Sequence, residues 1–396
     1  MGPGLALVAA GPGPQRPIRS ADTVRIAIDA RKLHDYGIGT YVRNLVHWLS
    51  RLQDDNTYVL LCRPDDVEQL RALGPRFEPL AEKAGNYSVR EQVSVPLALA
   101  RARVDLFHAP HYVVSPLTRC PFVVTIHDCI HLRFPQYLPN QMAGHYARTM
   151  MRMSAHRSKR ILTVSQASKQ DIVHYLGVAP EKVEVIYNAL DERLATPPTE
   201  ADMARVRERY QLSAPFILYT GNIKPHKNVD RLIEAYAIMR RKGVVDAKLL
   251  IIGEEISKYP NLRRLIHRHQ LHPHVRFFGF VSDDMLATLY RLATVFVFPS
   301  LYEGFGLPPL EAMAGGAPVI TSNVSSLPEV VGDAAVLIDP LDASALADAM
   351  ARVIGDPALR ADLIRRGHER VKAFSWERSV TRIRDVYQEL AGSSRG

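Results

Sequence analysis

Short apolar runs alternate with helical patterns along most of the chain, and this alternation constrains the fold more than any other feature. The first series of runs reads VRIAID (24–29), TYVLLC, VDLFHAP, FVVTIHD, RILTVS and VEVIYN (183–188). Such runs are typical of parallel strands that are buried on both faces and joined by crossover helices. Right-handed β–α–β units follow from this arrangement.

The alternation restarts after residue 200, and this restart predicts a second domain. The second series of runs is FILYTG (216–221), KLLIIG, VRFFGF, TVFVFP, PVITS and AAVLID (334–339). A chain of 396 residues also exceeds what one hydrophobic core usually supports. We therefore predict an α/β fold with two Rossmann-like, doubly wound parallel-sheet domains that face each other across a cleft. The expected parts are a disordered leader over 1–23, an N-terminal domain over 24–195, a C-terminal domain over 196–374, and a final helix over 375–396 with Ser375 as its N-cap.

Charge and cysteine content narrow the function classes. The formal charge of +9 favours an acidic partner, which can be nucleic acid, an anionic membrane surface or a phosphorylated small molecule. We expect no nucleic acid, because the basic residues are scattered among acids and no aromatic-basic RNA motif occurs. The three cysteines share no metal-ligand spacing and form no even set, which indicates a reducing compartment. No run approaches the roughly 20 apolar residues of a membrane span, so any membrane contact would be peripheral.

The stretch SLYEGFGLPPLEAMAGG (300–316) follows one of the predicted strands. Its two prolines mark the start of a helix, where a missing N–H costs nothing. The N–H groups of Phe305, Gly306 and Leu307 would then face the cleft at a helix N-terminus and form an anion site. Gly304, like Gly306, lets a ligand approach the backbone closely.

Two carboxylates, Glu303 and Glu311, flank this turn. An ionised carboxylate can accept hydrogen bonds from two sugar hydroxyls, so the pair suits a ligand that carries sugars. The alternative is structural, with Glu311 complementing the helix dipole and Glu303 solvated. The adjacent glycines favour the functional interpretation.

In FILYTGNIKPHKN (216–228), Gly221 turns the chain at the end of the second domain's first strand. Lys224 and Lys227 then precede a helix whose expected N-cap is Asn228. A lysine ammonium at this place can neutralise a diphosphate leaving group, whereas a lysine near a helix start is otherwise usually solvated. The position favours the phosphate role more for Lys227 than for Lys224.

Two motifs of the first domain also follow strands. Gly37 and Gly39 lie after the first strand, but the third glycine of the dinucleotide fingerprint is missing, so NAD is not indicated. The backbone at Gly39 would either approach a substrate phosphate or form a tight turn without a ligand. His127 and Asp128 end the run FVVTIHD; the histidine suits a general base or a substrate hydrogen bond, and the acid can orient a neighbour.

Several familiar motifs do not occur in the chain: Asp-x-Asp, the P-loop, Gly-x-Ser-x-Gly and His-Glu-x-x-His. The usual signatures of metal-dependent nucleotide-sugar enzymes, nucleotide triphosphatases, esterases and metalloproteases are thus missing. We expect no metal and no cofactor. Lysine and helix N-termini would neutralise the charge of a phosphate.

Four segments together make the chain resemble a known family: EGFGLPPLEAMAGGAPVI with its Glu-x7-Glu spacing, TGNIKPHKN, VTIHD and LPEVVGDAA. They resemble the retaining glycosyltransferases of family 4, also called group 1, which have the GT-B fold. The resemblance extends from Val24 to Tyr387. It implies that Glu303 contacts the donor sugar near the reacting carbon, that Glu311 holds the nucleotide ribose, and that Lys227 binds the donor diphosphate.

The resemblance also implies roles in the first domain, which would be the acceptor side. The loop with Gly37 and Gly39 would lie beside the phosphates and the acceptor, His127 would face the sugar, and the final helix would cross back to the first domain. Many members carry arginine after the glycine of the phosphate turn, where this chain has Asn222. Diphosphate binding would then depend on Lys227, with Lys224 as a second cation.

The expected activity is that of a retaining hexosyltransferase. It would move a hexose, with mannose as a lead, from a nucleotide diphosphate sugar to a glycan or lipid-linked saccharide acceptor in bacterial-type polysaccharide assembly in the cytoplasm. Two other hypotheses remain open: a nucleotide-sugar epimerase or hydrolase, and a non-catalytic GT-B subunit that supports a partner transferase.

The basic segment RTMMRMSAHRSKR (148–160) is the candidate for contact with an anionic membrane surface at its inner face. The alternative is a helix that buries its methionines and leaves its basic side in solvent.

Overall fold

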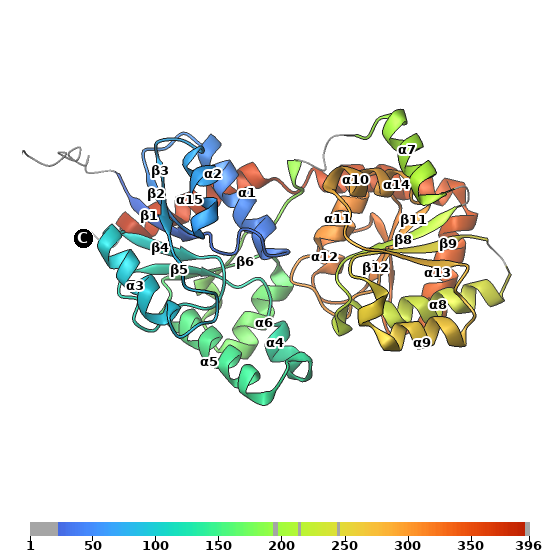
Figure 1. Ribbon diagram of the computed structural model, residues 1–396, viewed down its shortest axis with the longest axis horizontal. Coiled ribbons are helices and arrows are strands. Elements are labelled where there is room, and N and C mark those ends of the chain that lie inside the picture. Colours follow the sequence, from blue (N-terminus) through green and yellow to red (C-terminus); the bar gives the residue numbers. More distant parts are fainter. Residues whose placement is uncertain (1–22, 193–196, 213–214, 244–245, 393–396) are drawn as a thin grey trace, which may run out of the picture.

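The computed structural model describes residues 23–192, 197–212, 215–243 and 246–392, and it contains two α/β units side by side (Figure 1). The expected leader, except Thr23, and the expected domain boundary at 195/196 lie outside the described residues. The two parallel-sheet units have the predicted Rossmann-like class of fold.

The first unit contains, within the described residues, a seven-stranded sheet in the order β3-β2-β1-β4-β5-β6-β7. Its strands are β1 (Arg25–Asp29), β2 (Thr57–Cys62), β3 (Phe77–Ala81), β4 (Leu106–Ala109), β5 (Phe122–Thr125), β6 (Arg160–Thr163) and β7 (Val183–Val185). Its helices are α1 (Ile38–Arg51), α2 (Val67–Arg71), α3 (Glu91–Ala102), α4 (Ile130–Arg133), α5 (Gln141–Arg157) and α6 (Gln166–Leu176).

The second unit contains, in the part of the chain that the structure describes, a six-stranded sheet in the order β10-β9-β8-β11-β12-β13. Its strands are β8 (Phe216–Thr220), β9 (Lys248–Ile252), β10 (Val275–Phe278), β11 (Val295–Phe298), β12 (Val319–Ser322) and β13 (Ala335–Ile338). Its helices are α7 (Glu200–Tyr210), α8 (Val229–Arg241), α9 (Pro260–Arg268), α10 (Asp283–Leu292), α11 (Leu307–Ala314), α12 (Leu327–Val331), α13 (Ala343–Gly355) and α14 (Pro357–Val371).

Both sheets reverse their strand order beside their first strand. In the first unit β1 pairs in parallel with β2 and β4, and in the second β8 pairs in parallel with β9 and β11. Ligands of doubly wound sheets bind at such reversals, beyond the carboxyl ends of the strands. The loops that follow β1, β8 and β11 are therefore the expected walls of a site.

The strand β3 was not predicted from the sequence. Its segment FEPLA buries only Phe77 fully, and Pro79 interrupts the apolar pattern. Because β3 is an edge strand that pairs with β2 alone, a proline without an N–H is tolerated there. A short edge strand with one buried residue gives too weak a pattern to recognise.

The core of the first unit has two layers, because successive strand residues point to opposite faces. Ile26 and Ile28 of β1 pack with α1 and with the final helix, α15 (Trp376–Gly392), whereas Ala27 packs on the side that is covered by α3, α5 and α6. Burial on both faces explains why the strands read as continuous apolar runs.

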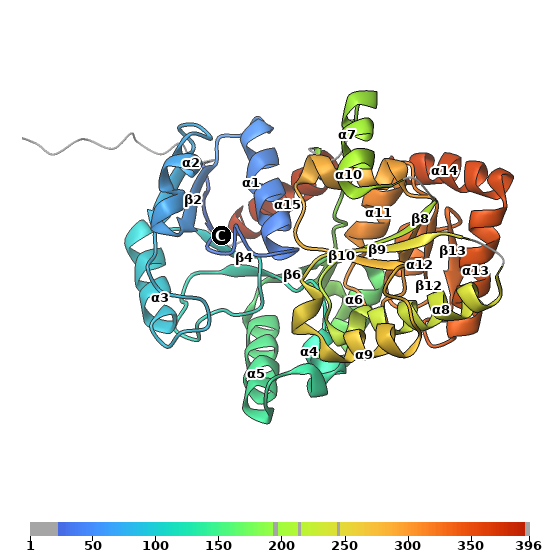
Figure 2. The ribbon, with the colours of Figure 1, turned by 45° about the vertical axis from the view of Figure 1, so that its right-hand side comes forward.

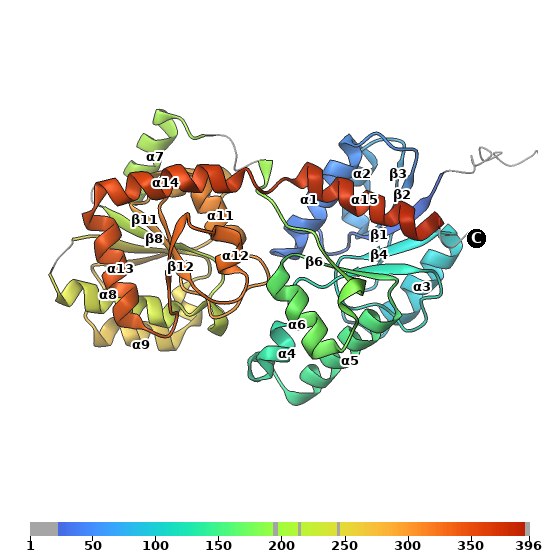
Figure 3. The same ribbon diagram turned by 180° about the vertical axis from the view of Figure 1, so that it is seen from behind.

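The helix α15 follows α14 of the second unit but packs against the first (Figure 3). Trp376, Ile383 and Tyr387 are buried in the same cluster as β1 and α1. The Tyr387 hydroxyl lies 2.5 Å from Nδ1 of His108 in β4. At the start of the helix, the Arg378 N–H donates to Ser375 Oγ at 3.4 Å.

No helix among the described residues combines the length and the apolarity that a bilayer crossing requires.

Candidate functional site

A cavity of about 410 Å³ lies between the two units, at the carboxyl ends of their strands. The points at which the two sheets reverse their strand order both open into this cavity, as expected from the topology. The predicted residues that line the cavity are Gly37, His127, Asp128, Gly221, Asn222, Lys227, Glu303, Gly304, Phe305, Gly306, Leu307 and Glu311.

Lys227 and Glu303 form an ion pair in the wall of this cavity. Lys227 Nζ lies 2.6 Å from Glu303 Oε1, and the two side chains are only 14% and 12% exposed. The ammonium group also lies 5.2 Å from the centre of the Phe298 ring. Because a buried charge is costly without its partner, the pair places two mutually compensating groups at the point where a ligand would bind.

The loop between β11 and α11 is held by two serines. Ser325 Oγ donates to the Glu303 carbonyl at 2.6 Å and accepts the Glu303 N–H at 3.2 Å. Ser326 Oγ lies 2.6 Å from the Phe305 carbonyl oxygen. Gly306, with φ of +119°, turns the chain into α11, and the N–H groups of Phe305 and Gly306 find no acceptor among the described residues. These amides are available to an anion.

Gly304 lies where the two units touch. An ideal Cβ at this residue would be 2.4 Å from the carbonyl oxygen of His127. The Gly304 carbonyl accepts the hydroxyls of Ser165 at 2.7 Å and Ser168 at 3.1 Å, both from the first unit. A side chain at position 304 would therefore force the units apart.

Glu311 points into the cavity from the second turn of α11. Its Oε2 accepts the Tyr290 hydroxyl at 3.1 Å, and that hydroxyl lies 2.9 Å from Thr220 Oγ1. Burial raises the pKa of Glu311 to about 7, against the lowering effect of the Tyr290 hydrogen bond and with smaller contributions from nearby acids. The carboxyl group is therefore poised to ionise near neutral pH, and a ligand with hydroxyl donors would favour its ionised form.

His127 faces the cavity as a neutral imidazole. Burial lowers its pKa, although the hydrogen bond to the Pro110 carbonyl and the charge of Asp128 act in the opposite direction. Nε2 lies 3.1 Å from that carbonyl oxygen, so Nε2 carries the proton and Nδ1 is left as an acceptor. Asp128 accepts the Ile130 N–H at 2.9 Å, which fixes the turn between β5 and α4.

Two asparagines add unsatisfied groups to the cavity wall. Asn188, after β7, and Asn222, after Gly221, both line the cavity, and the side-chain oxygen of each is buried without a hydrogen-bond partner. Buried polar groups are rarely left unpaired without a reason. The unpaired Asn222 oxygen can accept a hydrogen bond from a ligand hydroxyl.

Two predicted site residues do not line the cavity. The N–H of Gly39 donates to the carbonyls of Asp35 and Tyr36, and an ideal Cβ at Gly39 would lie 2.7 Å from the Leu33 carbonyl oxygen. These contacts favour the alternative of a tight turn that requires glycine at position 39, and a phosphate contact there stays a prediction. Lys224 is exposed outside the cavity, whereas Lys227, in the 3-10 turn Pro225–Lys227, lines it.

Asn228 occupies the N-cap position of α8, as expected, but its side chain does not cap the helix. Its Nδ2 donates to the carbonyls of Pro299 and Pro340 at 3.0 and 2.8 Å. The residue therefore ties the β8, β11 and β13 loops together behind Lys227.

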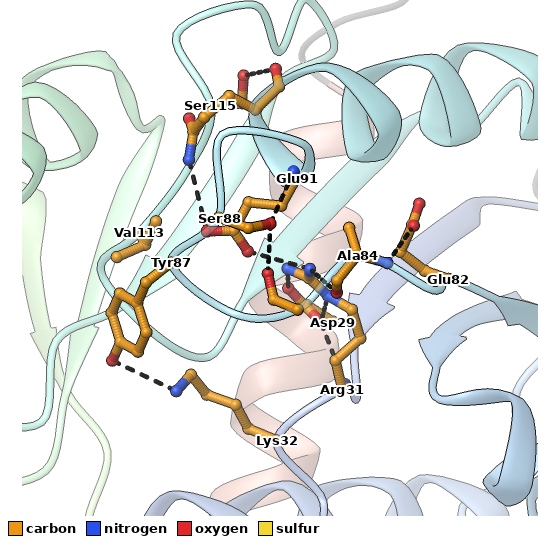
Figure 4. Close-up of polar contacts among 12 residues, drawn as sticks. Asp29, Arg31, Lys32, Glu82, Ala84, Tyr87, Ser88, Glu91, Val113 and Ser115 are labelled. Atoms are coloured by element: carbon orange, nitrogen blue, oxygen red, sulfur yellow. Dashed lines mark hydrogen bonds and ion pairs between the residues drawn. The ribbon is translucent and has the colours of Figure 1, made fainter.

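A buried ionic network stabilises the loop after β1 in the first unit (Figure 4). Arg31 lies between Asp29 and Glu91, with N–O distances of 2.6 and 3.1 Å. Burial lowers the pKa of Arg31, but the two carboxylates outweigh it and raise the pKa above its ordinary value. Next to this network, Lys32 Nζ lies 3.3 Å from the Tyr87 hydroxyl. The loop after β1 is thereby joined to the segment 82–91.

Several lining residues were missed by the sequence interpretation. Tyr36 and Phe280 are 74% and 83% exposed at opposite edges of the cavity, and Asp283 begins α10 beside it. Phe280 directly follows the strand β10, so the general rule that strand ends bind ligands was the available signal. Ser325 and Ser326 gave no such signal, since their role depends on a contact between distant loops.

Two parallel-sheet domains of this topology, with a cavity between them at the carboxyl ends of their strands, have the GT-B class of fold. Residues 36–194 match the family described as Glycosyltransferase Family 4, and residues 202–370 match the family described as Glycosyl transferases group 1. The chain belongs to this family of glycosyltransferases, group 1 or family 4.

Two curated relatives are mannosyltransferases of Escherichia coli. O-antigen chain mannosyltransferase B is 34% identical over 287 residues, which are 72% of this chain and 74% of that protein. Serotype-specific mannosyltransferase WbdA is 30% identical over 359 residues, 84% of this chain but 43% of WbdA, so the chain spans less than half of that relative. Anabaena HepE, solved in complex with UDP-glucose, shares the fold at 19% identity, with a TM-score of 0.73 over 92% of this chain and 99% of that one.

Proposed function

We propose that this glycosyltransferase moves a hexose from a nucleotide diphosphate sugar to a saccharide or lipid-linked saccharide, with retention of configuration. The observation that carries the proposal is the Lys227–Glu303 pair, 2.6 Å apart beside the unpartnered amides of Phe305 and Gly306. A cation and N–H donors suit a diphosphate, and an adjacent carboxylate suits a sugar hydroxyl.

Each part of the donor would bind to a different group of residues in the cavity. Its diphosphate would take Lys227 and the amides at the start of α11, its hexose would take Glu303, and its ribose would take Glu311. Asn222 supplies a further amide next to the diphosphate. The Lys227–Glu303 pair would be replaced by an ion pair between Lys227 and the diphosphate and by hydrogen bonds from sugar hydroxyls to Glu303, so both groups would keep a partner.

Transfer would proceed by attack on the same face from which the diphosphate leaves. The bond between the anomeric carbon and the phosphate oxygen breaks, the bond to the acceptor oxygen forms, and the acceptor proton passes to the departing phosphate oxygen. Lys227 and the α11 amides stabilise the charge that grows on the diphosphate. Neutral His127 would accept a hydroxyl of the hexose and help to orient the ring.

We propose mannose as the hexose and polysaccharide assembly as the setting, since two relatives are named as mannosyltransferases and one of them acts on O-antigen chains. We propose that no divalent metal is required, because the sequence has no Asp-x-Asp triplet and Lys227 supplies the opposing charge.

The test is a radiolabel transfer assay with purified protein, GDP-mannose and UDP-glucose in parallel, and a mannooligosaccharide acceptor in the presence of EDTA. We expect transfer from one donor, unaffected by EDTA, and a thermal shift with the matching nucleotide alone. No transfer by the wild type, or equal transfer by wild type and Glu303→Ala, would contradict the proposal.

The same assay without acceptor separates the two alternatives. A nucleotide-sugar epimerase or hydrolase would convert the donor as fast without acceptor as with it. A non-catalytic subunit would bind nucleotide without turnover. Product analysis by chromatography distinguishes all three outcomes.

We also propose that the enzyme works in the cytoplasm, against the inner face of the membrane. The candidate segment 148–160 buries Met151 and exposes Arg148 and Arg152, which by itself is the arrangement of an ordinary solvated helix. The start of α5 adds an exposed Met142, so membrane contact would centre there. Sedimentation with anionic liposomes at low and high salt tests the contact; no binding at either salt concentration would end this part of the proposal.

A further inference from the structure

The His127 ring is held by two contacts from within the first unit. Its Nε2 donates to the Pro110 carbonyl, directly after β4, at 3.1 Å. The ring of Tyr41, in α1, meets the His127 ring edge to face, with the centroids 4.9 Å apart and an interplanar angle of 83°. The carbonyl fixes which nitrogen carries the proton, and the Tyr41 ring limits the rotation of the imidazole.

Tyr41 lies behind the cavity wall and is anchored by a chain of buried polar side chains. It is 3% exposed, and its hydroxyl lies 3.2 Å from Thr125 Oγ1 of β5. Thr125 Oγ1 in turn lies 2.7 Å from Nε2 of His108 in β4. Nδ1 of His108 lies 2.5 Å from the hydroxyl of Tyr387, so the chain extends from Tyr41 to the crossing helix α15.

The hydrogen-bonding groups of this chain fit together without a charge. Burial lowers the pKa of His108 to about 3, with a smaller contribution from His127, so the imidazole is neutral and has one donor nitrogen. The Tyr387 hydroxyl has no other hydrogen-bond partner in the part of the chain that the structure describes. It therefore donates to Nδ1 of His108, which leaves the Nε2–H of His108 to donate to Thr125. Each polar group of the chain is thus paired, as buried polar groups generally are.

The helix α15 also contacts Tyr41 directly. Figure 2 shows α15 running from the second unit behind α1, and it packs on α1 and β4. The Trp376 ring, at the start of α15, lies 5.9 Å from the Tyr41 ring. Since α15 follows the last helix of the second unit, the docking of this helix on the first unit and the place of the Tyr41 ring depend on each other.

We propose that Tyr41 is a positioning residue for transfer: its ring holds His127 at the angle that the contact with the hexose requires. The hydrogen bonds through Thr125 and His108 anchor this ring to Tyr387 of α15. The inference rests on the proposed function, in which neutral His127 accepts a hydroxyl of the hexose. Because a hexose that is poorly oriented still binds but reacts slowly, loss of Tyr41 should lower kcat and leave nucleotide binding unchanged.

The test compares three variants in the transfer assay with GDP-mannose. Tyr41→Leu removes the ring, and we expect kcat to fall about tenfold or more, with the donor KM and the Kd for GDP within about twofold of wild type. Tyr41→Phe keeps the ring, and kcat should stay within about threefold. Tyr387→Phe removes the hydroxyl at the far end of the chain and should lower kcat about fivefold.

A double-mutant cycle separates positioning from a merely structural role. In a His127→Ala background the Tyr41 ring has no imidazole to hold, so Tyr41→Leu should lower kcat by no more than about twofold further. If thermal unfolding shows that Tyr41→Leu does not fold, Tyr387→Phe in the two backgrounds gives the same comparison. A loss by the same factor in both backgrounds would overturn the proposal.

The matched control is Tyr58→Phe. It removes another buried tyrosine hydroxyl of the first unit, which donates to Asp54 at 2.8 Å and does not line the cavity. Its kcat should stay within about twofold of wild type. A loss as large as that of Tyr41→Leu would show that damage to any buried tyrosine slows transfer, and would also overturn the proposal.

Nitrogen-15 NMR of histidine-labelled protein tests the contact without transfer. The His127 signals, identified by their loss in His127→Ala, should show a protonated Nε2 in wild type and in Tyr41→Phe. In Tyr41→Leu the shifts of the two ring nitrogens should approach each other, because both tautomers become populated. Unchanged His127 signals in Tyr41→Leu would overturn the inference. Absence of transfer by wild type would instead contradict the proposed function, and the NMR comparison alone would then decide whether Tyr41 orients His127.

Discussion

The two walls of the interdomain cavity are built differently. The wall of the second unit consists of main-chain amides, a buried Lys227–Glu303 pair and loops that Ser325 and Ser326 tie together. The wall of the first unit presents the Tyr36 side chain, which is 74% exposed, together with His127 and Asp128. A diphosphate demands fixed geometry, which a tied backbone supplies, whereas an acceptor that differs between enzymes is better met by replaceable side chains.

The largest effect should come from breaking the charged part of the second unit's wall. Lys227→Ala removes the cation that faces the diphosphate and leaves Glu303 buried without its partner. We expect kcat for transfer to fall about 10³-fold, as when other preorganised charge stabilisers are removed. Initial rates with radiolabelled donor measure this.

The matched control is Lys242→Ala, which breaks an exposed ion pair with Asp348 on the surface of the same unit. Such pairs contribute little, so activity should stay within about twofold. If Lys227→Ala lowers kcat by less than tenfold, transfer does not depend on the charge of Lys227.

The contact between the walls is tested by Gly304→Ala. Because the new Cβ would lie 2.4 Å from the His127 carbonyl oxygen, the units must separate and the reacting groups lose their alignment. We expect kcat to fall about 10²-fold. Gly355→Ala is the control, since a Cβ there meets nothing within 4 Å; equal activity of the two variants would contradict the tight contact.

Glu311, which is proposed to bind the ribose, should titrate near neutral pH. Burial raises the pKa of Glu311 to about 7, and only the ionised group accepts two hydroxyl donors. The Kd for GDP should therefore decrease as pH rises from 6 to 8, by no more than about tenfold per unit. Calorimetry of Glu311→Gln should give a flat profile in this range, and a wild-type Kd that increases with pH would reverse the assignment.

The raised pKa of Glu311 also affects the free energy of unfolding, which should decrease as pH rises, whereas the affinity for GDP should increase. The folded protein holds the Glu311 proton up to about pH 7, whereas an unfolded glutamate loses it near pH 4.3. Between these values the native state binds more protons, so this carboxyl group makes the protein less stable as pH rises. Denaturant unfolding should show this decline in wild type and less of it in Glu311→Gln.

The smallest effect should come from a contact between the units outside the cavity. The Glu329 carboxylate of α12 accepts the N–H groups of Gln166 and Ala167 and the Tyr187 hydroxyl, all from the other unit, at 2.8 to 3.2 Å. Glu329→Ala should weaken the contact between the units and lower kcat about three- to tenfold. Small-angle scattering would detect the expansion, and Tyr187→Phe, which keeps the two N–H bonds, should have a weaker effect.

The sequence was most informative where a function is carried by the backbone. Parallel strands that are buried on both faces appear in the sequence as apolar runs. Because the loops at their carboxyl ends line the cavity, the segment 303–311 could be predicted as part of its lining. The edge strand β3 escaped because Pro79 and a mostly exposed segment break that pattern.

Contacts between distant segments could not be read from the sequence. Lys224 and Lys227 have the same chemistry and differ only in whether they line the cavity. Gly39 is glycine because of the Leu33 carbonyl, and Asn228 bonds to two loops far away in the chain. Each of these outcomes depends on tertiary neighbours that no local pattern specifies.

The 2.6 Å contact between Lys227 and Glu303 would make binding of the proposed donor depend on both of its parts. A bare anion that took the ammonium would leave the carboxylate without a partner, and a neutral sugar that took the carboxylate would leave the ammonium without one. A molecule that offers phosphate and hydroxyl at the correct separation would satisfy both groups. Under the proposed function the nucleotide product lacks the sugar, so the Lys227–Glu303 pair would form again and favour release of the nucleotide.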